Sequence, residues 1–278
     1  MNGRHYRQMR RAQEAAGKFL CIGLDPDIEK IPESARRDSV RESIVAFNRA
    51  VIDATADIAG SYKPNSAFYE AHGDEGWQAL RETIFYIREA APDLPVILDA
   101  KRGDIGNTND GYAAMAFEHL AADAITVHPY MGRESLSPFL AREDKGIFVL
   151  CRTSNAGAGE FQDAKIGGEE LYKLVARSVA GEWNAKGNCG LVAGATYPDE
   201  LRAVRALAPG IPILVPGIGA QSGDLEKSVA AGKDEKGAGI VIAAGRAIIY
   251  ASAGRDFAEA ARKKSQEFHG AIGAALLQ

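Results

Sequence analysis

Short apolar runs alternate along the whole chain with longer stretches in which apolar residues recur at helical spacing. The short runs do not alternate strictly between apolar and polar residues, so each one predicts a strand that is covered on both faces. Strands of this kind belong to parallel sheets whose connections are helices. Eight are predicted, over residues 19–24, 60–63, 96–100, 124–127, 147–151, 190–193, 213–215 and 240–243.

The stretches between these runs carry apolar residues three or four positions apart, which is the spacing of an amphipathic helix. Residues 39–58 are the clearest case, with Val40, Ile44, Phe47 and Val51 on one face. A leading helix is predicted at about residues 2–16. Further helices are predicted over residues 76–91, 108–121, 168–185, 197–208, 221–231 and 257–268.

A regular succession of strands and helices predicts an α/β protein with a single (β/α)8 barrel over residues 1–278. The alternative is an open, doubly wound sheet, which carries a glycine-rich dinucleotide turn after its first strand. The first strand here ends in Gly23-Leu24-Asp25 without that motif, and no linker or repeat divides the chain. The barrel is therefore the preferred fold, with its active site expected at the carboxyl ends of the strands.

Charged residues follow the first three predicted strands. Asp25 comes after the first strand, Lys63 ends the second, and the third leads into Asp99, Lys101 and Asp104. Asp99 and Lys101 are two positions apart, so on a strand both side chains face the same way. Burying charges is costly unless they pair, and two lysines with two aspartates can neutralise one another. A structural ion-pair network is the alternative, but so many ionisable residues on the catalytic face of a barrel favour chemistry.

Such an array suits a decarboxylation. The ammonium group of Lys101 can give a proton to a developing carbanion. A carboxylate that faces the carboxylate of the substrate repels it, and this repulsion ends as CO2 leaves. The residues leave open whether this repulsion or stabilisation of the carbanion contributes more to the rate.

Glycine-rich turns follow the seventh and eighth predicted strands, where barrels often bind phosphate through backbone N–H groups. The first turn holds Gly217, Gly219 and Gln221, and the second holds Gly245 and Arg246. The guanidinium of Arg246 offers several donors that suit a phosphate. Gln221 lies in a segment that is typical of a mobile loop and could close over the phosphate. Glycines also occur in ordinary tight turns. The prediction of a phosphate site therefore depends on glycine-rich turns after both the seventh and the eighth strand.

Composition argues against several classes of function. A net charge of −4 disfavours a nucleic-acid-binding surface, which needs an excess of positive charge. The three cysteines form no CxxC pair, and no histidines and carboxylates have metal-ligand spacing, so we expect no disulfide, metal or cofactor. No apolar run is long enough to span a membrane, and the basic N-terminus lacks the apolar core of a signal peptide. We therefore expect a cytoplasmic protein.

Several of these segments together resemble the orotidine 5′-phosphate decarboxylase family. The strongest match is DAKRGDIGNT at residues 99–108, which is similar to the DxKxxDI signature of that family followed by a threonine. The residues of these segments are most similar to those of the longer bacterial subgroup of the family. The other matches are GLDPD at 23–27, KPN at 63–65, VHPYMG at 127–132, RTSN at 152–155, PGIGAQ at 216–221 and GR at 245–246.

The resemblance implies decarboxylation of orotidine 5′-phosphate to uridine 5′-phosphate in de novo pyrimidine synthesis, by a homodimer with shared active sites. It implies that Lys101 protonates C6 of the pyrimidine, while Lys63 and Asp99 hold the ribose and the charge array. The residues that would reach into the site of the partner are Asp104, Ile105 and Thr108. The implied substrate contacts are Asp25 at a ribose hydroxyl, Ser154 and Pro216 at the base, and Gln221 and Arg246 at the phosphate.

Two other functions fit part of the pattern. A metal-assisted sugar-phosphate decarboxylase, aldolase or epimerase shares the DxK pair and the phosphate turns, but it needs an acid as a metal ligand. A non-catalytic phosphate-binding protein is not excluded by the fold, although it has no use for a carboxylate aimed at an anion. We interpret His72 and His128 as hydrogen-bonding residues. For Arg152 the sequence leaves two interpretations open, a substrate contact and a member of an ion pair.

Overall fold

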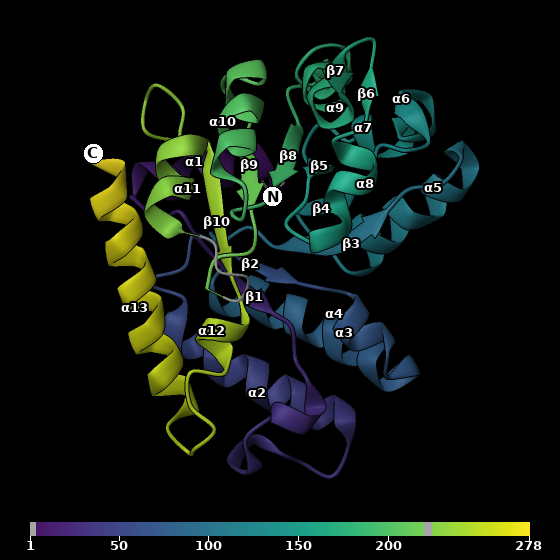
Figure 1. Ribbon diagram of the computed structural model, residues 1–278. Helices are drawn as coiled ribbons and strands as arrows, with labels where there is room; N and C mark the ends of the chain where they lie inside the picture. Colours follow the sequence, from purple (N-terminus) through teal and green to yellow (C-terminus); the bar gives the residue numbers. More distant parts are fainter. Residues whose placement is uncertain (1–3, 220–223) are drawn as a thin grey trace.

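The computed structural model describes residues 4–219 and 224–278. Its centre is a parallel sheet of eight strands in the order β2-β1-β10-β9-β8-β5-β4-β3 (Figure 1). Isolated bridges from Tyr62 to Val96 and from Asn65 to Asp99 join β2 to β3, so the sheet closes into the predicted (β/α)8 barrel. Each strand lies within about two residues of its predicted position. The strands are β1 (Leu20–Leu24), β2 (Ser61–Pro64), β3 (Ile97–Arg102), β4 (Ala124–Val127), β5 (Gly146–Arg152), β8 (Cys189–Ala193), β9 (Ile213–Val215) and β10 (Ile240–Ala244).

Helices cover the outside of the barrel and connect the strands (Figure 1). Ser39 caps the first long one, because its hydroxyl accepts a hydrogen bond from the N–H of Glu42. The long helices are α2 (Val40–Thr55), α4 (Gly73–Ala90), α5 (Gly106–Ala114) with a π-helical extension (Met115–His119), α9 (Leu171–Ala180), α10 (Pro198–Leu207), α11 (Leu225–Gly232) and α13 (Phe257–Leu276). The shorter ones are α3 (Ala67–Glu70), α6 (Gly132–Ser135), α7 (Ser137–Leu140), α8 (Gly159–Gln162) and α12 (Arg246–Ile249).

The helix predicted over residues 168–185 is wrong in its first part. Strands β6 (Lys165–Ile166) and β7 (Glu169–Glu170) pair there as a small antiparallel hairpin outside the barrel sheet. Gly167 and Gly168 connect them with φ angles of 61° and 91°, which glycine adopts without the steric cost of a side chain. Two consecutive glycines with positive φ suit the turn of a hairpin. Helix α9 therefore begins only after the hairpin, at Leu171.

Helices α11 and α13 differ from their predicted ranges by four residues or more at one end. Helix α11 begins at Leu225 after the cap residue Asp224, and the predicted start at residue 221 lies outside the described residues. Helix α13 continues beyond residue 268 to Leu276 and packs against α2 and α11. Helix α13 also contacts β1, which pairs with β10, so it covers the barrel where its first and last strands are neighbours.

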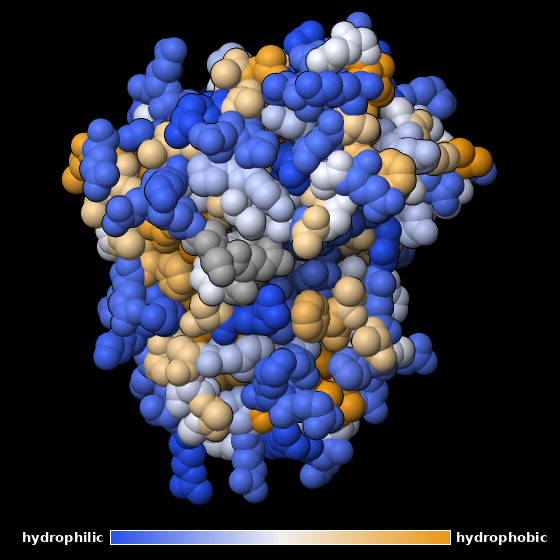
Figure 2. All heavy atoms as spheres, in the orientation of Figure 1, coloured by the Kyte–Doolittle hydropathy of each residue, from blue (hydrophilic) through white to orange (hydrophobic). Residues whose placement is uncertain are grey.

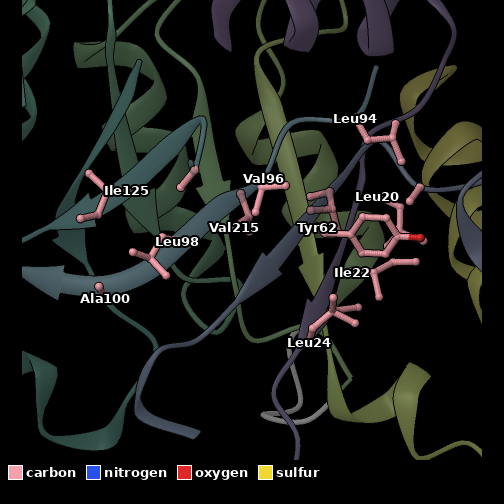
Figure 3. Close-up of a cluster of buried hydrophobic side chains, with 14 of the residues drawn as sticks. Leu20, Ile22, Leu24, Tyr62, Leu94, Val96, Leu98, Ala100, Ile125 and Val215 are labelled. Atoms are coloured by element: carbon pink, nitrogen blue, oxygen red, sulfur yellow. The ribbon is translucent and has the colours of Figure 1, made fainter. Parts of the chain in front are cut away.

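Alternate residues of each strand point to opposite faces and divide the core into two layers. The outer layer lies between the strands and the helices, and Leu20, Ile22, Leu24 and Tyr62 belong to it (Figure 3). The inner layer fills the barrel itself. It consists of Tyr6, Cys21, Ile97, Ala124, Phe148, Val192, Leu214, Val241 and Ala243.

The N-terminal helix α1 (Tyr6–Ala15), predicted at about residues 2–16, closes the amino-terminal end of the barrel. The buried ring of Tyr6 packs edge-on against Phe148, with 5.7 Å between the ring centroids. Just before the helix, Arg4 pairs with the buried carboxylate of Asp123 at 2.7 Å. This end of the barrel is therefore apolar and sealed, and the polar side chains of the interior lie toward the carboxyl ends of the strands.

No helix among the described residues is long and apolar enough to cross a membrane. The face drawn in Figure 2 is mostly hydrophilic, with hydrophobic residues in small patches. Protein surfaces commonly carry scattered apolar residues of this kind.

Candidate active site

Two lysines and one aspartate meet inside the carboxyl end of the barrel. Lys63 belongs to β2, Asp99 and Lys101 belong to β3, and the bridge between Asn65 and Asp99 holds the two strands together. Lys63 Nζ lies 2.9 Å from Asp99 Oδ2, and Lys101 Nζ lies 2.7 Å from Asp99 Oδ1. Lys63 and Asp99 are buried, whereas the side chain of Lys101 is about half exposed. The carboxylate thus joins one buried ammonium group to one that can reach a ligand.

Strand β3 becomes irregular at this point. Leu98 pairs with Ile125 and Arg102 pairs with Val127, so three residues of β3 face Thr126 alone. Lys101 has a φ of 47°, a left-handed conformation that costs a residue with a side chain roughly 1–2 kcal/mol. The sequence predicted that Asp99 and Lys101 meet through the alternation of a regular strand. In the structure they meet through this bulge, which folds the chain so that the ammonium group turns back onto the carboxylate.

The charges of the array change one another's pKa. Burial would raise the pKa of Asp99, but the ammonium groups of Lys63 and Lys101 outweigh it and hold that pKa well below its usual range. Burial would lower the pKa of Lys63, but the carboxylates of Asp99 and Asp25 outweigh it and raise that pKa. Lys63 and Asp99 are therefore both charged at neutral pH. Asp25 behaves differently, because burial and the nearby Asp99 raise its pKa in spite of Lys63.

Asp25→Asn is expected to stabilise the fold at neutral pH. A carboxyl group whose pKa is higher in the folded than in the unfolded protein stabilises the fold in acid, and this contribution is lost as the pH rises through the folded value. At pH 7 the carboxylate is therefore an unfavourable charge, which the amide lacks. The amide oxygen can still accept the N–H of Asn65, which Asp25 Oδ1 accepts at 3.2 Å.

Thermal unfolding at several pH values tests this expectation. The midpoint at pH 7 should rise by about 2 °C or more, and the gain should shrink toward pH 4, where Asp25 itself becomes protonated. An equal or lower midpoint for the variant at pH 7 would contradict the expected effect of burial on Asp25.

A cavity of about 130 Å³ lies beside the array, between the ends of β1, β2, β9 and β10 and the turn after β5. Gly217 has a φ of 100° and Gly219 has a φ of 79°, so the turn after β9 requires glycine at both positions. Gln221, which was predicted to contact the phosphate, lies outside the described residues. The cavity is lined by Gly23, Asp25, Lys63, Ser154, Pro216, Gly217, Ile218, Ala243, Ala244, Gly245 and Arg246.

Most of the predicted substrate contacts therefore surround one space. Ser154 comes from a different part of the chain than the phosphate turns, and it reaches the cavity because the turn after β8 has no side chain in its way. A Cβ atom on Gly194 would lie 2.6 Å from that of Ser154. A larger cavity, of about 680 Å³, opens near α1 beside Arg10, Arg205 and Lys233, at the opposite end of the barrel from the charge array.

Asp104 does not join the array among the residues that the structure describes. It lies in the loop between β3 and α5, and its Oδ1 accepts the N–H of Ile105 at 2.7 Å. Within one chain the array therefore holds two lysines and Asp99 without Asp104, because the chain leaves the barrel after the bulge, and the expected entry of Asp104 into the site of a partner stays a prediction. Asp25 is instead the second carboxylate near Lys63. Ile105 and Thr108 are exposed beside Asp104.

Buried polar groups fix the loop that carries Asp104. The fully buried Asn109 accepts the N–H of Asp104 at 3.1 Å and donates to its carbonyl at 2.7 Å. His128 Nδ1 accepts the N–H of Tyr130, so Nε2 carries the proton and donates to the carbonyl of Gly103 at 3.0 Å. His128 thus has the hydrogen-bonding role that we expected. Asn109 was missed, although an asparagine inside a helix is an unfavourable choice that indicates a specific partner.

Arg152 forms an ion pair, which decides the alternative that the sequence left open. Its buried guanidinium lies 2.9 Å from Asp163 Oδ1 and stacks on the ring of Tyr197, with 4.2 Å from Cζ to the ring centroid. These contacts hold the segment after β5, which includes Ser154, against the turn after β8. Arg152 therefore supports the wall of the cavity from behind.

Other reactive groups lie apart from this site. Cys21, Cys151 and Cys189 are buried free thiols, and burial raises the pKa of Cys21 to about 11. They are core residues, as expected. Among residues 4–219 and 224–278, no three His, Cys, Asp or Glu side chains are grouped in a way that could hold a metal ion.

Comparison with known proteins identifies the family of this chain. The family model described as orotidine 5′-phosphate decarboxylase / HUMPS family matches residues 18–263. The chain is 50% identical to an orotidine 5′-phosphate decarboxylase of Azoarcus sp. (strain BH72) over 96% of this chain and 97% of that protein. It superposes on an OMP decarboxylase of Leishmania donovani with a TM-score of 0.82 and 41% identity, over 96% of this chain and 98% of that one.

A second solved structure, a UMP synthase of Leishmania donovani, gives a TM-score of 0.85 at 42% identity. The match covers 97% of this chain but only 57% of the synthase, so the barrel corresponds to one part of that longer protein. The full-length relatives and the family model belong to the family that the sequence motifs resemble. The chain therefore belongs to the orotidine 5′-phosphate decarboxylase / HUMPS family.

Proposed function

We propose that this protein converts orotidine 5′-phosphate to uridine 5′-phosphate and CO2, as a step of de novo pyrimidine nucleotide synthesis. The observation that carries the proposal is the buried array of Lys63, Asp99 and Lys101 beside a glycine-lined cavity that ends at Arg246. The name of the Azoarcus relative supports the same reaction. In this proposal residues 1–278 form one catalytic domain. The cytoplasmic location expected from the sequence stays a prediction.

In the proposed reaction the bond between C6 and the carboxylate of the substrate breaks, and its electron pair stays on C6. The ammonium group of Lys101 then donates a proton to C6 and becomes an amine, which regains a proton from solvent. Both lysines pair with Asp99, but the half-exposed side chain of Lys101 supports this role, whereas that of Lys63 is buried. Lys63 keeps Asp99 ionised and well oriented, so that the negative charge of Asp99 faces the carboxylate that leaves.

The cavity would hold the ribose and the phosphate. In this proposal Asp25 accepts a ribose hydroxyl, and Arg246 binds the phosphate together with the turns at Gly217, Gly219 and Gly245. At about 130 Å³ the cavity is smaller than the ~300–1,000 Å³ of typical ligand pockets. We therefore propose that the pyrimidine ring lies beyond it, over the array, with Ser154 and Pro216 at its edge, while a phosphate contact by Gln221 stays a prediction from the sequence.

We further propose a homodimer in which each active site receives Asp104, Ile105 and Thr108 from the partner. Support comes from three large apolar side chains on adjacent loops. Ile105 is 53% exposed, Tyr130 is 88% exposed and Met131 is 42% exposed. The hydrogen bonds of His128 to Gly103 and Tyr130 tie these two loops together, so the apolar side chains form one surface that a second copy can cover. The same surface would carry the carboxylate of Asp104 to the other protomer.

The first test is the absorbance of orotidine 5′-phosphate after addition of purified protein that was treated with EDTA. The expected result is a loss of substrate absorbance and a stoichiometric yield of uridine 5′-phosphate. Conversion only after magnesium is restored, or turnover of a sugar phosphate instead, would favour a metal-assisted enzyme of the same family. No turnover of either substrate, with retained phosphate binding, would favour a binding protein.

A further inference from the structure

Thr126 touches both Asp99 and Lys101, yet neither the signature motif nor the cavity includes it. It is the third residue of β4 and the only polar side chain in the run AITV. Its side chain is 1% exposed and points into the barrel, where it meets the bulge of β3. Thr126 Oγ1 lies 2.8 Å from Asp99 Oδ1 and 2.9 Å from the backbone N of Lys101.

The direction of both hydrogen bonds follows from the groups involved. The N–H of Lys101 has only a proton to offer, so the hydroxyl accepts there. Asp99 is ionised and has no proton to give, so the hydroxyl donates its own proton to the carboxylate. One hydroxyl group therefore connects the backbone of Lys101 to the carboxylate that its own ammonium group contacts.

The bulge needs such a contact. Three residues of β3 face one residue of β4, so the N–H of Lys101 donates to this side chain and not to a carbonyl of β4. Lys101 also holds a left-handed φ of 47°, which persists only where the surroundings impose it. If the hydroxyl were absent, the Lys101 N–H would lose its acceptor and Asp99 Oδ1 would lose one of its two donors.

We propose that Thr126 is a positioning residue, whose hydroxyl fixes the Lys101 backbone and the Asp99 carboxylate in the geometry that delivers the proton to C6. This inference rests on the proposed function of the two charged residues. Thr126 itself does not take part in proton transfer, and its contribution is the orientation of groups that do. Misplacement of a catalytic group by a fraction of an ångström lowers the rate without changing the affinity for substrate in proportion.

The test compares Thr126→Val, which removes the hydroxyl at nearly constant shape, with Thr126→Ser, which keeps it. Thr126→Val should lower kcat on the order of 10- to 100-fold, the effect of losing a hydrogen bond to a charged group, while KM stays within about threefold. Thr126→Ser should recover kcat to within about threefold of the unsubstituted protein. If Thr126→Val does not fold, Thr126→Ala replaces it, because it also lacks the hydroxyl and places no larger side chain there, and a loss of kcat that Thr126→Ser does not show is again expected.

Thr55→Val is the matched control. Thr55 is also fully buried, donates to the carbonyl of Val51 and lies 2.8 Å from the hydroxyl of Tyr62, but it belongs to α2 outside the barrel. Its replacement should lower the midpoint of thermal unfolding and leave kcat unchanged. A parallel loss of kcat in both valine variants would therefore indicate a general effect of stability and would overturn the inference.

The remaining outcomes distinguish the inference from the proposed function. An unchanged kcat in Thr126→Val, or an equal loss in the valine and serine variants, would overturn the role of the hydroxyl. A raised KM at constant kcat would place Thr126 in substrate binding, which also overturns it. If the unsubstituted protein does not decarboxylate orotidine 5′-phosphate, the proposed function fails and the inference fails with it. If the unsubstituted protein is active and Thr126→Val matches it, only the inference fails.

Discussion

Lys101→Ala is expected to lower kcat for orotidine 5′-phosphate by at least ~10²–10⁴-fold, which is the effect of removing a general acid. Lys63 is not expected to replace it, because its ammonium group is buried, pairs with Asp99 at 2.9 Å and lines the cavity proposed for the ribose and phosphate. The loss also leaves Asp99 with one ammonium partner in place of two. Single-turnover decay of the substrate absorbance, with protein in excess, measures this step directly.

The fold should tolerate the same substitution. The side chain of Lys101 is about half exposed, and the buried Asp99 keeps Lys63 as its partner at 2.9 Å, so no buried charge is left unpaired. The midpoint of thermal unfolding should therefore change only slightly, so that the loss of activity is not a loss of structure. Lys264→Ala is a suitable control, because it removes an exposed lysine that pairs with Glu267 on α13. Near-normal turnover by Lys101→Ala would rule out Lys101 as the proton donor.

A mixture of Asp104→Ala and Lys101→Ala proteins is expected to regain activity that neither variant has alone. In the proposed dimer a mixed pair holds one site with both residues intact and one site with neither. When subunits exchange at random, half of the dimers are mixed, so about one quarter of all sites are complete. The mixture should therefore reach about 25% of the activity of the unsubstituted protein, well above either variant.

This experiment requires proof that subunits exchange. Two affinity tags, one on each variant, allow the mixed dimers to be isolated and assayed directly. Isolated mixed dimers that are as inactive as the single variants would contradict a site built from two chains. Activity in proportion to the fraction of mixed dimers would support it. A control mixture of Lys101→Ala with Lys63→Ala should show no recovery, because both residues lie in the same array of one chain.

The repeating apolar runs predicted all eight strands, because a buried strand has a local signature in its own residues. The same periodicity placed Asp25, Lys63 and Asp99 at strand ends, where a barrel brings them together whatever the details of its closure. The hairpin at Gly167 and Gly168 was missed because each of its strands is only two residues long and lies outside the core, so neither carries the apolar run of a buried strand.

The sequence by itself determined the barrel, the position of each strand and the identity of the residues at the carboxyl ends, because each of these depends on residues close together in the chain. Only the tertiary structure decided how those residues combine. It turned Lys101 back onto Asp99 through a bulge, placed Thr126 against both, tied Asp104 to Asn109 outside the array and sealed the opposite end with Tyr6. These contacts depend on the register between neighbouring strands and on where the barrel closes. Both are set by packing between segments that are far apart in the sequence. No short stretch of the sequence carries a signal for that packing.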